Sequence, residues 1–454
     1  MGLTQTLCAR MREADFAGLG DACIAKVREA IIDGIAVGLA GSGEKPVALL
    51  REHYRELGGS SQAAFWGSAQ RGSVVQAAYV NGVATHVLDF EPMWSPPTHS
   101  LSPTVPAAFA LAEWLPLSGR QVIQAVAKGL EIQGRLQYAG DQFVPEELRF
   151  HPPGFAGVIG SAVVAADLLG LDEMQWRHAI GIAASRAGAL LANVGSMTKA
   201  THCGQAAAAG LDAALLARRG FTGNPDVFEA HKGFIGTFYP DAFHEDRLLA
   251  WGQPFRVVDP GLAIKLFPSQ YGTHYGITAG LELHRRIAGR AIRRVNMRTP
   301  VMKYVDRPAP ATGLDGKFSL QYTTAIALLD GAVRIASFTD ERRFRADVVD
   351  LLTRFEMTQD AAIQGDFHHM FVEVSAELVD GSTESTVCRG PRGSWSNPMT
   401  PQEHADKLQD CFAHAMPGRY SAPLLRGLHQ LETLDSAALR AVMTELQGST
   451  SVAG

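Results

Sequence analysis

Three stretches rich in alanine and glycine constrain the fold of this chain more than any other feature. They run over residues 157–171, 179–192 and 204–220. Small side chains let helix backbones approach one another closely, so stretches of this length predict helices that pack tightly together. The last stretch ends on two arginines followed by Gly220, which is typical of a helix C-terminus. We therefore expect a core of closely stacked helices.

The N-terminal part of the chain continues this pattern. Between Ala22 and Gly41, isoleucine and valine recur three or four residues apart, and glycines close the run. This spacing places the apolar side chains on one face of a helix of several turns. The first half of the chain is therefore expected to be helical.

Beyond about residue 262 the pattern changes to alternation. Polar and apolar residues alternate over 294–298 and again over 371–378, which predicts strands. Asp380-Gly381, followed by residues 383–388, predicts a hairpin. We expect a type I′ turn there, whose two central residues both need positive φ.

Helical patterns at 323–338 and 346–355 lie between these strands, which describes a small α+β unit. From Pro401 the pattern is helical again, so the C-terminal helices are able to return to the first domain, while residues 448–454 look like a frayed tail. The expected fold class is mainly α, with a large all-helical domain formed by both chain ends (1–262 and 396–454) plus a smaller inserted α+β domain (263–395).

Composition excludes several classes of protein. Of 454 residues, 46% are hydrophobic and 19% charged, as expected of a globular chain. The formal net charge of -5 offers no basic surface, so we expect neither a nucleic-acid partner nor a membrane partner. Five scattered cysteines without a CxxC pair argue against disulfides and a metal cradle. They fit a reducing compartment, and since no signal sequence follows Met1, we expect a cytoplasmic protein.

Familiar catalytic motifs are absent from the sequence. It contains no GxSxG nucleophile elbow, no HExxH zinc site and no GxxxxGK[ST] phosphate loop. Serine hydrolase, zinc protease and nucleotide-binding functions are therefore not indicated.

Residues 89–100 are the strongest candidate for the place where chemistry occurs. This segment carries Asp89, His99, a tryptophan and three prolines, without a periodic apolar pattern, between two apolar helical stretches. A loop held by two rigid helices is a common location for proton-transfer groups. A solvated surface crossover is the alternative. Other candidates in loops or at helix starts are each explained as readily by packing or solvation when taken alone: His151, Lys199, Lys265, His274 and Tyr322.

A series of motifs runs through most of the chain in this order: His86-Val87-Leu88-Asp89-Phe90, Thr98-His99, Pro106-Ala107, Phe150-His151-Pro152, Lys199 with His202 and Gly204, Gly220-Phe221-Thr222-Gly223, Lys265-x-x-Pro268-Ser269-x-x-x-Thr273-His274, Phe318-Ser319-Leu320-Gln321-Tyr322, Leu329-Asp330-Gly331 and Asn397-Pro398-Met399. With this set the chain resembles the MmgE/PrpD family, which includes 2-methylcitrate dehydratase, cis-aconitate decarboxylase and iminodisuccinate epimerase. The resemblance implies the same two-domain fold, a homodimer, and a site at the domain interface without a metal or an organic cofactor.

The resemblance also implies which residues line that site. Lys199 and Lys265 would neutralise substrate carboxylates and stabilise developing negative charge. His99 or His151 would move a carbon-bound proton, since imidazole titrates near neutral pH. Asp89 would orient the imidazole or raise its basicity. Tyr322 would donate to a leaving hydroxyl or to a carboxylate.

Two positions depart from the family pattern. Gln270 stands where cis-aconitate decarboxylase carries a further histidine. An amide cannot exchange protons near pH 7, so a decarboxylation that relies on this imidazole should be impaired unless His274 takes its place. Met93 stands where relatives often carry a small polar residue, which favours a substrate with less polar surface at that point. We expect four residues to bind the substrate: Met93, Lys265, Gln270 and His274.

These features lead to one expected function and three alternatives. The leading expectation is a lyase that removes a proton α to a carboxylate of a small anionic di- or tricarboxylate, by elimination as in 2-methylcitrate dehydratase. The alternative is an epimerase of an iminodisuccinate-like dicarboxylate, which needs bases on two sides of the substrate. A cis-aconitate decarboxylase and a non-catalytic family member are less favoured.

Overall fold

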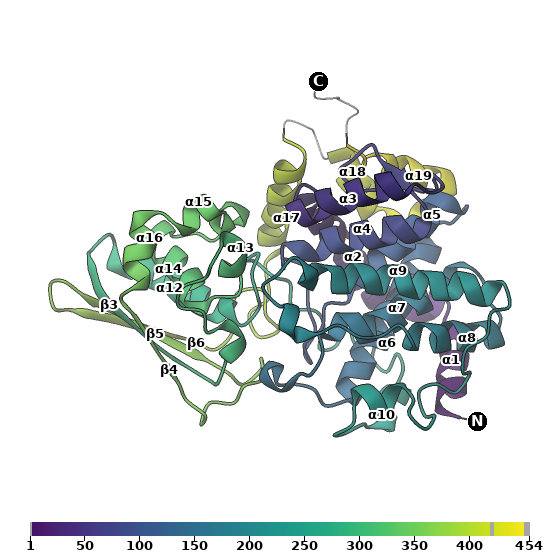
Figure 1. Ribbon diagram of the computed structural model, residues 1–454, viewed down its shortest axis with the longest axis horizontal. Helices are drawn as coiled ribbons and strands as arrows, with labels where there is room; N and C mark the ends of the chain where they lie inside the picture. The colour runs from purple at the N-terminus through teal and green to yellow at the C-terminus, as the bar shows by residue number, and fades with distance from the viewer. Residues whose placement is uncertain (1, 418–421, 449–454) are drawn as a thin grey trace.

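The computed structural model describes residues 2–417 and 422–448 and forms two lobes joined by several crossing segments (Figure 1). The larger lobe contains the N-terminal and C-terminal helices together. Its helices are α1 (Leu3–Glu13), α2 (Asp21–Gly41), α3 (Lys45–Leu57), α4 (Val74–Val87), α5 (Leu101–Trp114), α6 (Gly119–Ala139), α7 (Pro152–Leu168), α8 (Glu173–Ala184), α9 (Thr198–Arg218), α10 (Phe234–Phe238), α11 (Glu245–Leu249), α17 (Pro401–Ala415), α18 (Ala422–His429) and α19 (Ser436–Thr444).

The smaller lobe packs helices on one side of a four-stranded sheet of order β4-β3-β5-β6. Its strands are β3 (Ile292–Thr299), β4 (Phe355–Gln359), β5 (Val372–Leu378) and β6 (Thr383–Cys388). Its helices are α12 (Thr273–Ile287), α13 (Gly313–Gly316), α14 (Leu320–Asp330), α15 (Asp340–Arg343) and α16 (Ala346–Leu352). Only β3 and β4 pair in parallel, and alternate residues of β5 are buried, as the sequence pattern predicts.

The helices of the larger lobe are closely stacked, which confirms the packing predicted from the stretches rich in alanine and glycine. A Cβ atom added to Gly82 of α4 would lie 2.8 Å from the Cα of Gly204 in α9, and one added to Gly210 would lie 2.4 Å from the carbonyl oxygen of Val158 in α7. Both distances are shorter than any side chain tolerates. Glycine at these positions therefore lets α4, α7 and α9 pack with their backbones almost in contact.

The hairpin between β5 and β6 is confirmed, but its turn is not of type I′. Gly381 has a φ of 86°, whereas Asp380 is not among the described residues with positive φ. The amide of Gly381 donates to the carbonyl of Leu378, which places Val379 and Asp380 at the centre of the turn. A three-residue loop with one glycine in the left-handed region replaces the expected two-residue turn.

The expected fold class is wrong on two points. The larger lobe is not all-helical, since β1 (Ala63–Ala64) and β2 (Arg71–Gly72) form an antiparallel pair there. The buried amide of Asn81 exchanges hydrogen bonds with the backbone of Trp66 and Ala64, which holds that strand extended beside α4. Two-residue strands carry no alternation that a sequence pattern could reveal.

The second point concerns the inserted α+β domain, which is only partly evident. The apolar core of the smaller lobe includes Met93 from the first half of the chain. Met93 also pairs through its backbone with Ala263, and Ile264 pairs with Gly393. The molecule is thus mostly helical with two small sheets, and segments at Met93, residues 263–264 and Gly393 pair where the two lobes meet. The expected boundaries at 262/263 and 395/396 stay a prediction.

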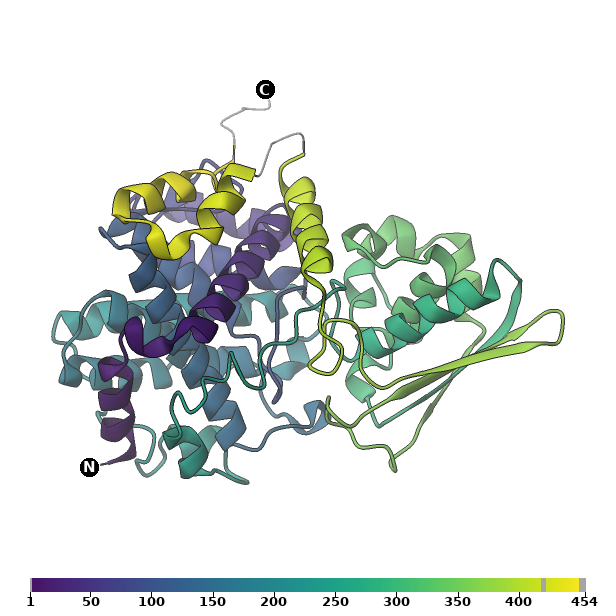
Figure 2. The same ribbon diagram turned by 180° about the vertical axis from the view of Figure 1, so that it is seen from behind.

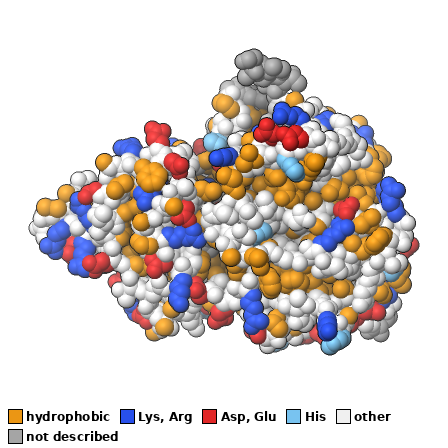
Figure 3. Space-filling view, viewed as in Figure 1, with side chains coloured by type: hydrophobic (Ala, Val, Ile, Leu, Met, Phe, Trp, Pro, Cys, Tyr) orange, Lys and Arg blue, Asp and Glu red, His pale blue; other side chains and the backbone are white. Residues whose placement is uncertain are grey.

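Helix α17 stands between the two lobes and packs against α2 (Figure 2). Hydrophobic side chains gather on the face of the larger lobe that Figure 3 presents, while charged ones are frequent on the smaller lobe. In the part of the chain that the structure describes, no helix combines the length and apolarity that a membrane span requires. The expected frayed tail lies outside the described residues, apart from Gly448. Cytoplasmic localisation and the homodimer stay predictions.

Candidate active site

A cavity of about 460 Å³ lies where residues 89–100 face the smaller lobe. Helices α4 and α5 hold the two ends of this loop, which confirms its expected placement. A Ser73–Gln76 capping box fixes the start of α4. The lining residues are Asp89, Met93, Pro97, Thr98, His99, Pro145, Glu146, Leu148, His151, Pro152, Pro153, Leu191, Ala192, Val194, Lys199, Gln270, Tyr271, Lys303, Tyr304, Arg307 and Phe367.

Asp89 stands two residues after the end of α4, in a backbone conformation that is unusual for a residue with a side chain. Its φ is 51°, in the left-handed region, and its amide donates to the carbonyl of His86 at 2.8 Å. Such a conformation costs about 1–3 kcal/mol and persists where the surroundings enforce it. Here the enforcing contacts are the ion pairs of the Asp89 carboxylate.

The carboxylate of Asp89 binds two lysines. Lys199, in the first turn of α9, donates to Oδ2 at 2.6 Å, and Lys265 donates to Oδ1. Asp89 is 2% exposed and Lys265 is fully buried. Burial alone would raise the pKa of Asp89, but the two ammonium groups outweigh it and hold that pKa well below its usual range. Burial lowers the pKa of Lys265 despite this partner. One carboxylate therefore faces two cations, which leaves the centre short of negative charge.

Lys317 adds a third buried amine beside this centre. Its Nζ donates to the carbonyls of Leu88 and Pro268 at 3.1 and 3.2 Å, so it ties the active-site loop to the smaller lobe. Burial lowers the pKa of Lys317 to about 8. Carbonyl oxygens satisfy its hydrogen bonds without neutralising its charge, which increases the attraction of the site for anions.

Four histidines gather against the lysines. The ring centroid of His86 lies 4.8 Å from that of His99 and 5.4 Å from that of His151. The Nδ1 atoms of His151 and His202 are 3.2 Å apart. Burial lowers the pKa of all four rings, to about 4 for His202, and nearby lysines lower them further. These imidazoles are therefore neutral near pH 7 and able to accept a proton.

His99 and His151 line the cavity, as the sequence predicts. Nε2 of His99 lies 3.7 Å from Oδ1 of Asp89, which is longer than a hydrogen bond. Asp89 therefore neutralises the lysines directly, and its influence on His99 is electrostatic. A carboxylate at this distance would still stabilise an imidazolium formed on His99.

The sequence reasoning did not assign four members of this cluster to the site: His86, Glu91, His202 and Lys317. His86 and His202 stand in the family motifs, and two of the four also carried a local signal. His202 follows Lys199 by three residues in α9, a spacing that places both side chains on one helix face. Glu91 stands two residues after Asp89 in the same loop. Lys317 had no such signal, because it reaches the site from the smaller lobe.

Three of the expected site residues do not line the cavity. Lys265 is fully buried behind Asp89 and reaches the cavity only through that carboxylate. The hydroxyl of Tyr322 donates to the carbonyl of Ser337 inside the smaller lobe, and burial raises its pKa. His274 is fully buried, with Nε2 3.3 Å from the carbonyl of Ser269, and it does not line the cavity. Met93 and Gln270 do line it. The structure therefore places the amide of Gln270 at the cavity wall, with the imidazole of His274 buried behind that wall.

The cavity lining includes further polar groups. Lys303 and Arg307 line the cavity, and Arg307 pairs with Asp315. Oε2 of Glu146 and the hydroxyl of Tyr304 are buried and have no hydrogen-bond partner among the described residues. These groups are available to the distal end of a substrate.

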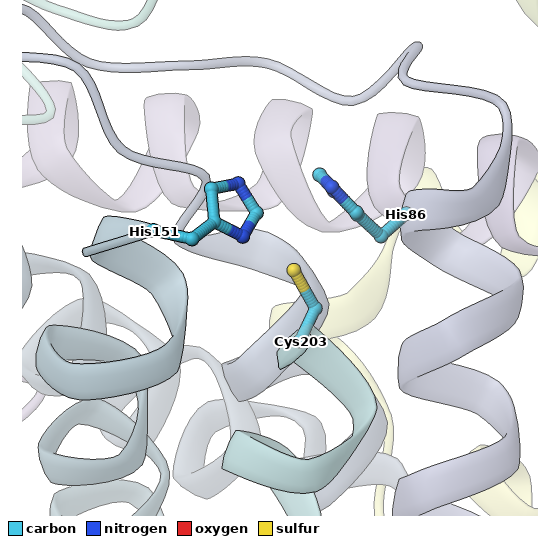
Figure 4. Close-up of side chains that lie close together, drawn as sticks. All are labelled: His86, His151 and Cys203. Atoms are coloured by element: carbon cyan, nitrogen blue, oxygen red, sulfur yellow. The ribbon is translucent and has the colours of Figure 1, made fainter. Parts of the chain in front are cut away.

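His86, His151 and Cys203 could in principle hold a metal ion, because one ligand atom from each lies within 4.8 Å of the others (Figure 4). However, both ring nitrogens of His86 already contact other side chains, Glu91 and Lys199. Burial also raises the pKa of the Cys203 thiol well above its usual range, so the sulfur is a poor ligand. The residues fit hydrogen bonding better than metal binding.

Comparisons with known proteins match nearly the whole chain. A family model described as the MmgE/PrpD N-terminal domain matches residues 5–245, and one described as the MmgE/PrpD C-terminal domain matches 267–421. The chain is 30% identical over 447 residues to cis-aconitate decarboxylase of Mus musculus, covering 96% of this chain and 91% of that protein. It is 29% identical over 449 residues to that of Homo sapiens, covering 96% and 93%. For Aspergillus terreus the identity is 27% over 358 residues, covering 72% of each chain.

Proposed function

Because this chain belongs to the MmgE/PrpD family, we propose that it is a lyase that transfers a proton at a carbon next to a carboxylate of a small di- or tricarboxylate. One observation carries the proposal: among the described residues, Asp89 is the only carboxylate that binds Lys199 and Lys265, and it does so beside a cavity lined by neutral imidazoles. A bound carboxylate would supply the missing negative charge. Lys199, which lines the cavity, would stabilise the enediolate that forms when a neighbouring carbon loses its proton, and the buried charge of Lys265 would add to the positive potential from behind Asp89.

The roles follow from which groups touch the cavity. His99 is neutral, lines the cavity and has Asp89 at 3.7 Å, so it is the base that takes the carbon-bound proton. Lys199 lines the cavity as an ammonium group and is the acid that protonates the departing group. In an elimination, the C–O bond breaks, the hydroxyl leaves as water with the proton from Lys199, and the electrons of the C–H bond form the alkene.

Two further cations at the cavity favour a substrate with more than one carboxylate. Lys303 and Arg307 line the cavity together with Lys199, and Arg307 is already paired with Asp315. A cavity of this size is typical of sites for small organic ligands. Tyr304 and Glu146 would accept or donate hydrogen bonds to a hydroxyl group of the same substrate.

Decarboxylation is the second candidate, and the similarity to cis-aconitate decarboxylases over nearly the whole chain favours it. In that reaction a C–C bond breaks, carbon dioxide leaves, and the carbanion takes a proton from Lys199. Gln270 at the cavity wall argues against a decarboxylation that needs an imidazole there, since His274 stays behind the wall. Elimination therefore remains the preferred reaction.

Product analysis by NMR tests the proposal. The purified protein is incubated with citrate-like and methylcitrate-like hydroxy acids, cis-aconitate, and amino- and imino-dicarboxylates. Elimination yields an alkene and water, decarboxylation yields a dicarboxylate one carbon shorter, and epimerisation yields the mirror-image centre.

We expect at least one hydroxy acid to be converted to an alkene. His99→Ala should abolish the conversion, whereas His53→Ala, at an exposed site on α3, should leave it unchanged. If no compound in the panel is converted by the folded protein, the proposed function is wrong.

A further inference from the structure

Behind Lys199, a row of buried side chains leads from the cavity into the larger lobe. Nζ of Lys199 lies 2.9 Å from Nε2 of His86, and Nδ1 of His86 lies 2.7 Å from Oε1 of Glu91. The side chain of His86 is 1% exposed and that of Glu91 is fully buried. Of these three residues, only Lys199 lines the cavity. His86 and Glu91 can therefore influence a substrate only through neighbours that line the cavity, among them Lys199 and, at 3.8 Å from Oε1 of Glu91, His99.

The position of a single proton on His86 decides how this row works. Burial, and then Lys199, lowers the pKa of His86 well below its usual range, so the ring is neutral and carries one N–H. If the proton is on Nδ1, that N–H donates to Glu91 and the bare Nε2 accepts from the Lys199 ammonium. If the proton is on Nε2, it faces the ammonium as a second donor, and the contact is repulsive unless Lys199 loses a proton.

The contacts of Glu91 select the first arrangement. Ser102 donates to the same carboxyl group through its amide at 2.8 Å and through its hydroxyl at 2.7 Å. With the N–H of His86, three donors converge on two oxygen atoms, which favours an ionised carboxylate. An ionised carboxylate only accepts hydrogen bonds, so it requires the proton of His86 to be on Nδ1.

We propose that Glu91 and His86 are positioning residues that fix the His86 tautomer and thereby hold the Lys199 ammonium group aimed at the substrate. This inference rests on the proposed function, in which Lys199 is the acid. Held by Oδ2 of Asp89 on one side and Nε2 of His86 on the other, the ammonium group of Lys199 has a remaining N–H for the cavity. The logic matches that of a catalytic triad, where a buried carboxylate fixes the tautomer of a histidine that contacts the reacting group.

The surroundings of Glu91 make the row sensitive to pH. Burial raises the pKa of Glu91 to about 8, while the hydrogen bonds from Ser102 and the charge of Lys265 act in the opposite direction. When Glu91 takes up a proton, its O–H donates to Nδ1, and the proton of His86 moves to Nε2, against Lys199. The charged or titratable groups that flank the row are Asp89, Lys265, His99, His151, His202 and Cys203.

Glu91→Gln is the sharpest test because it preserves shape. Its amide oxygen can accept the N–H of Ser102, and its NH₂ group then faces Nδ1 of His86 as a donor. The proton of His86 must move to Nε2, as when Glu91 is protonated. Glu113→Gln is the matched control, since Glu113 is a largely buried carboxylate that accepts the amide of Ala64 at 3.1 Å and pairs with Arg71 instead of a histidine.

The tautomer of His86 can be measured directly by NMR on ¹⁵N-histidine-labelled protein, at a pH above the Glu91 pKa of about 8. The His86 signals are assigned by their absence in His86→Gln. We expect the N–H on Nδ1 in the unmodified protein and in the control Glu113→Gln, and on Nε2 in Glu91→Gln. A proton on Nε2 in the unmodified protein, or an unchanged tautomer in Glu91→Gln, would overturn the inference even if the enzyme is active.

The kinetic readout is the pH profile of kcat. Activity should require ionised Glu91, so it is present above its pKa and lost as the pH falls below about 8. Glu91→Gln should lower kcat about 100-fold or more. Its pH profile should also lack the fall in kcat on the acid side, because the glutamine side chain cannot ionise. An unchanged fall in Glu91→Gln contradicts the inference. If the tautomers behave as expected but no compound is turned over, the proposed function fails and the role of Glu91 and His86 stands.

Discussion

Two buried aspartates in the larger lobe are surrounded by the same residue types, yet their settings differ. Asp33 of α2 binds Lys407 of α17 at 2.8 and 3.0 Å and His404 at 3.0 Å. Asp89 binds two lysines and has His99 at 3.7 Å. Around Asp33 one carboxylate meets one ammonium, whereas around Asp89 the cations are in excess and a cavity adjoins them. Charge balance therefore distinguishes a structural ion pair from a site that attracts an anion.

The two clusters are also connected. Nζ of Lys407 donates to the carbonyl of Phe90 at 3.0 Å, and Phe90 follows Asp89 in the active-site loop. The ion pair of Asp33 and Lys407 thus joins α2 to α17 and supports the loop from behind. Its effect on the reaction should be indirect, through the stability of the fold.

The largest expected effect is the loss of activity when the charge of Asp89, the aspartate beside the cavity, is removed. Asp89→Asn removes the only carboxylate that binds Lys199 and Lys265 in the described chain, so their placement and charge are lost together. We expect kcat/KM to fall about 10³–10⁴-fold, as for other groups that act as a unit with their neighbours. Steady-state kinetics on the substrate found by product analysis would measure the loss.

Tyr322→Phe is the contrasting variant, because that hydroxyl bonds to Ser337 within the smaller lobe. It should keep kcat/KM within about tenfold of the unmodified protein. If Asp89→Asn keeps comparable activity, the charge-excess centre has no role in the reaction.

A smaller effect, on stability rather than on activity, is expected when the charge of Asp33 is removed. Asp33→Asn leaves Lys407 buried without its counter-ion, which should cost about 3–5 kcal/mol in the free energy of unfolding. The activity per folded molecule should change little. Denaturant unfolding together with kinetics at a temperature where the variant is folded would measure both.

The contribution of the Asp33–Lys407 ion pair to stability depends on pH in a defined way. Burial would raise the pKa of Asp33, but Lys407 and His404 outweigh it and lower that pKa in the folded protein. Its stabilising contribution is therefore present above the unfolded-state pKa of about 3.9 and is lost as the pH falls through the folded-state value. The unmodified protein should lose stability more steeply than Asp33→Asn below about pH 4. Equal slopes would show that Asp33 is not held ionised by its partners.

Parts of this molecule were predictable from the sequence because their signals are local. Helix periodicity, small-residue packing, the alternation of β5 and the loop carrying Asp89 and His99 all depend on neighbours within a few residues. The turn at Asp380-Gly381 was assigned to the wrong type, because the pair Asp-Gly fits more than one hairpin loop and only the backbone angles decide between them.

The rest depended on contacts between distant segments. Lys317 and Lys407 reach the active-site loop from hundreds of residues away in sequence, so no spacing reveals them. Tyr322 stands in a family motif, but its helix turns the hydroxyl toward Ser337. The pairing of His86 with Glu91 could not be read either, because it depends on how the backbone turns at Asp89.

The most direct test of the central claim is whether the hydrogen on the carbon next to a carboxylate is lost to solvent during turnover. The substrate is labelled with deuterium at that carbon and converted in H₂O, and the product is analysed by NMR and mass spectrometry. The account predicts a product that has lost one deuterium from that carbon with the unmodified protein, and no conversion above background with His99→Ala. A product that keeps all of its deuterium at that carbon would contradict it.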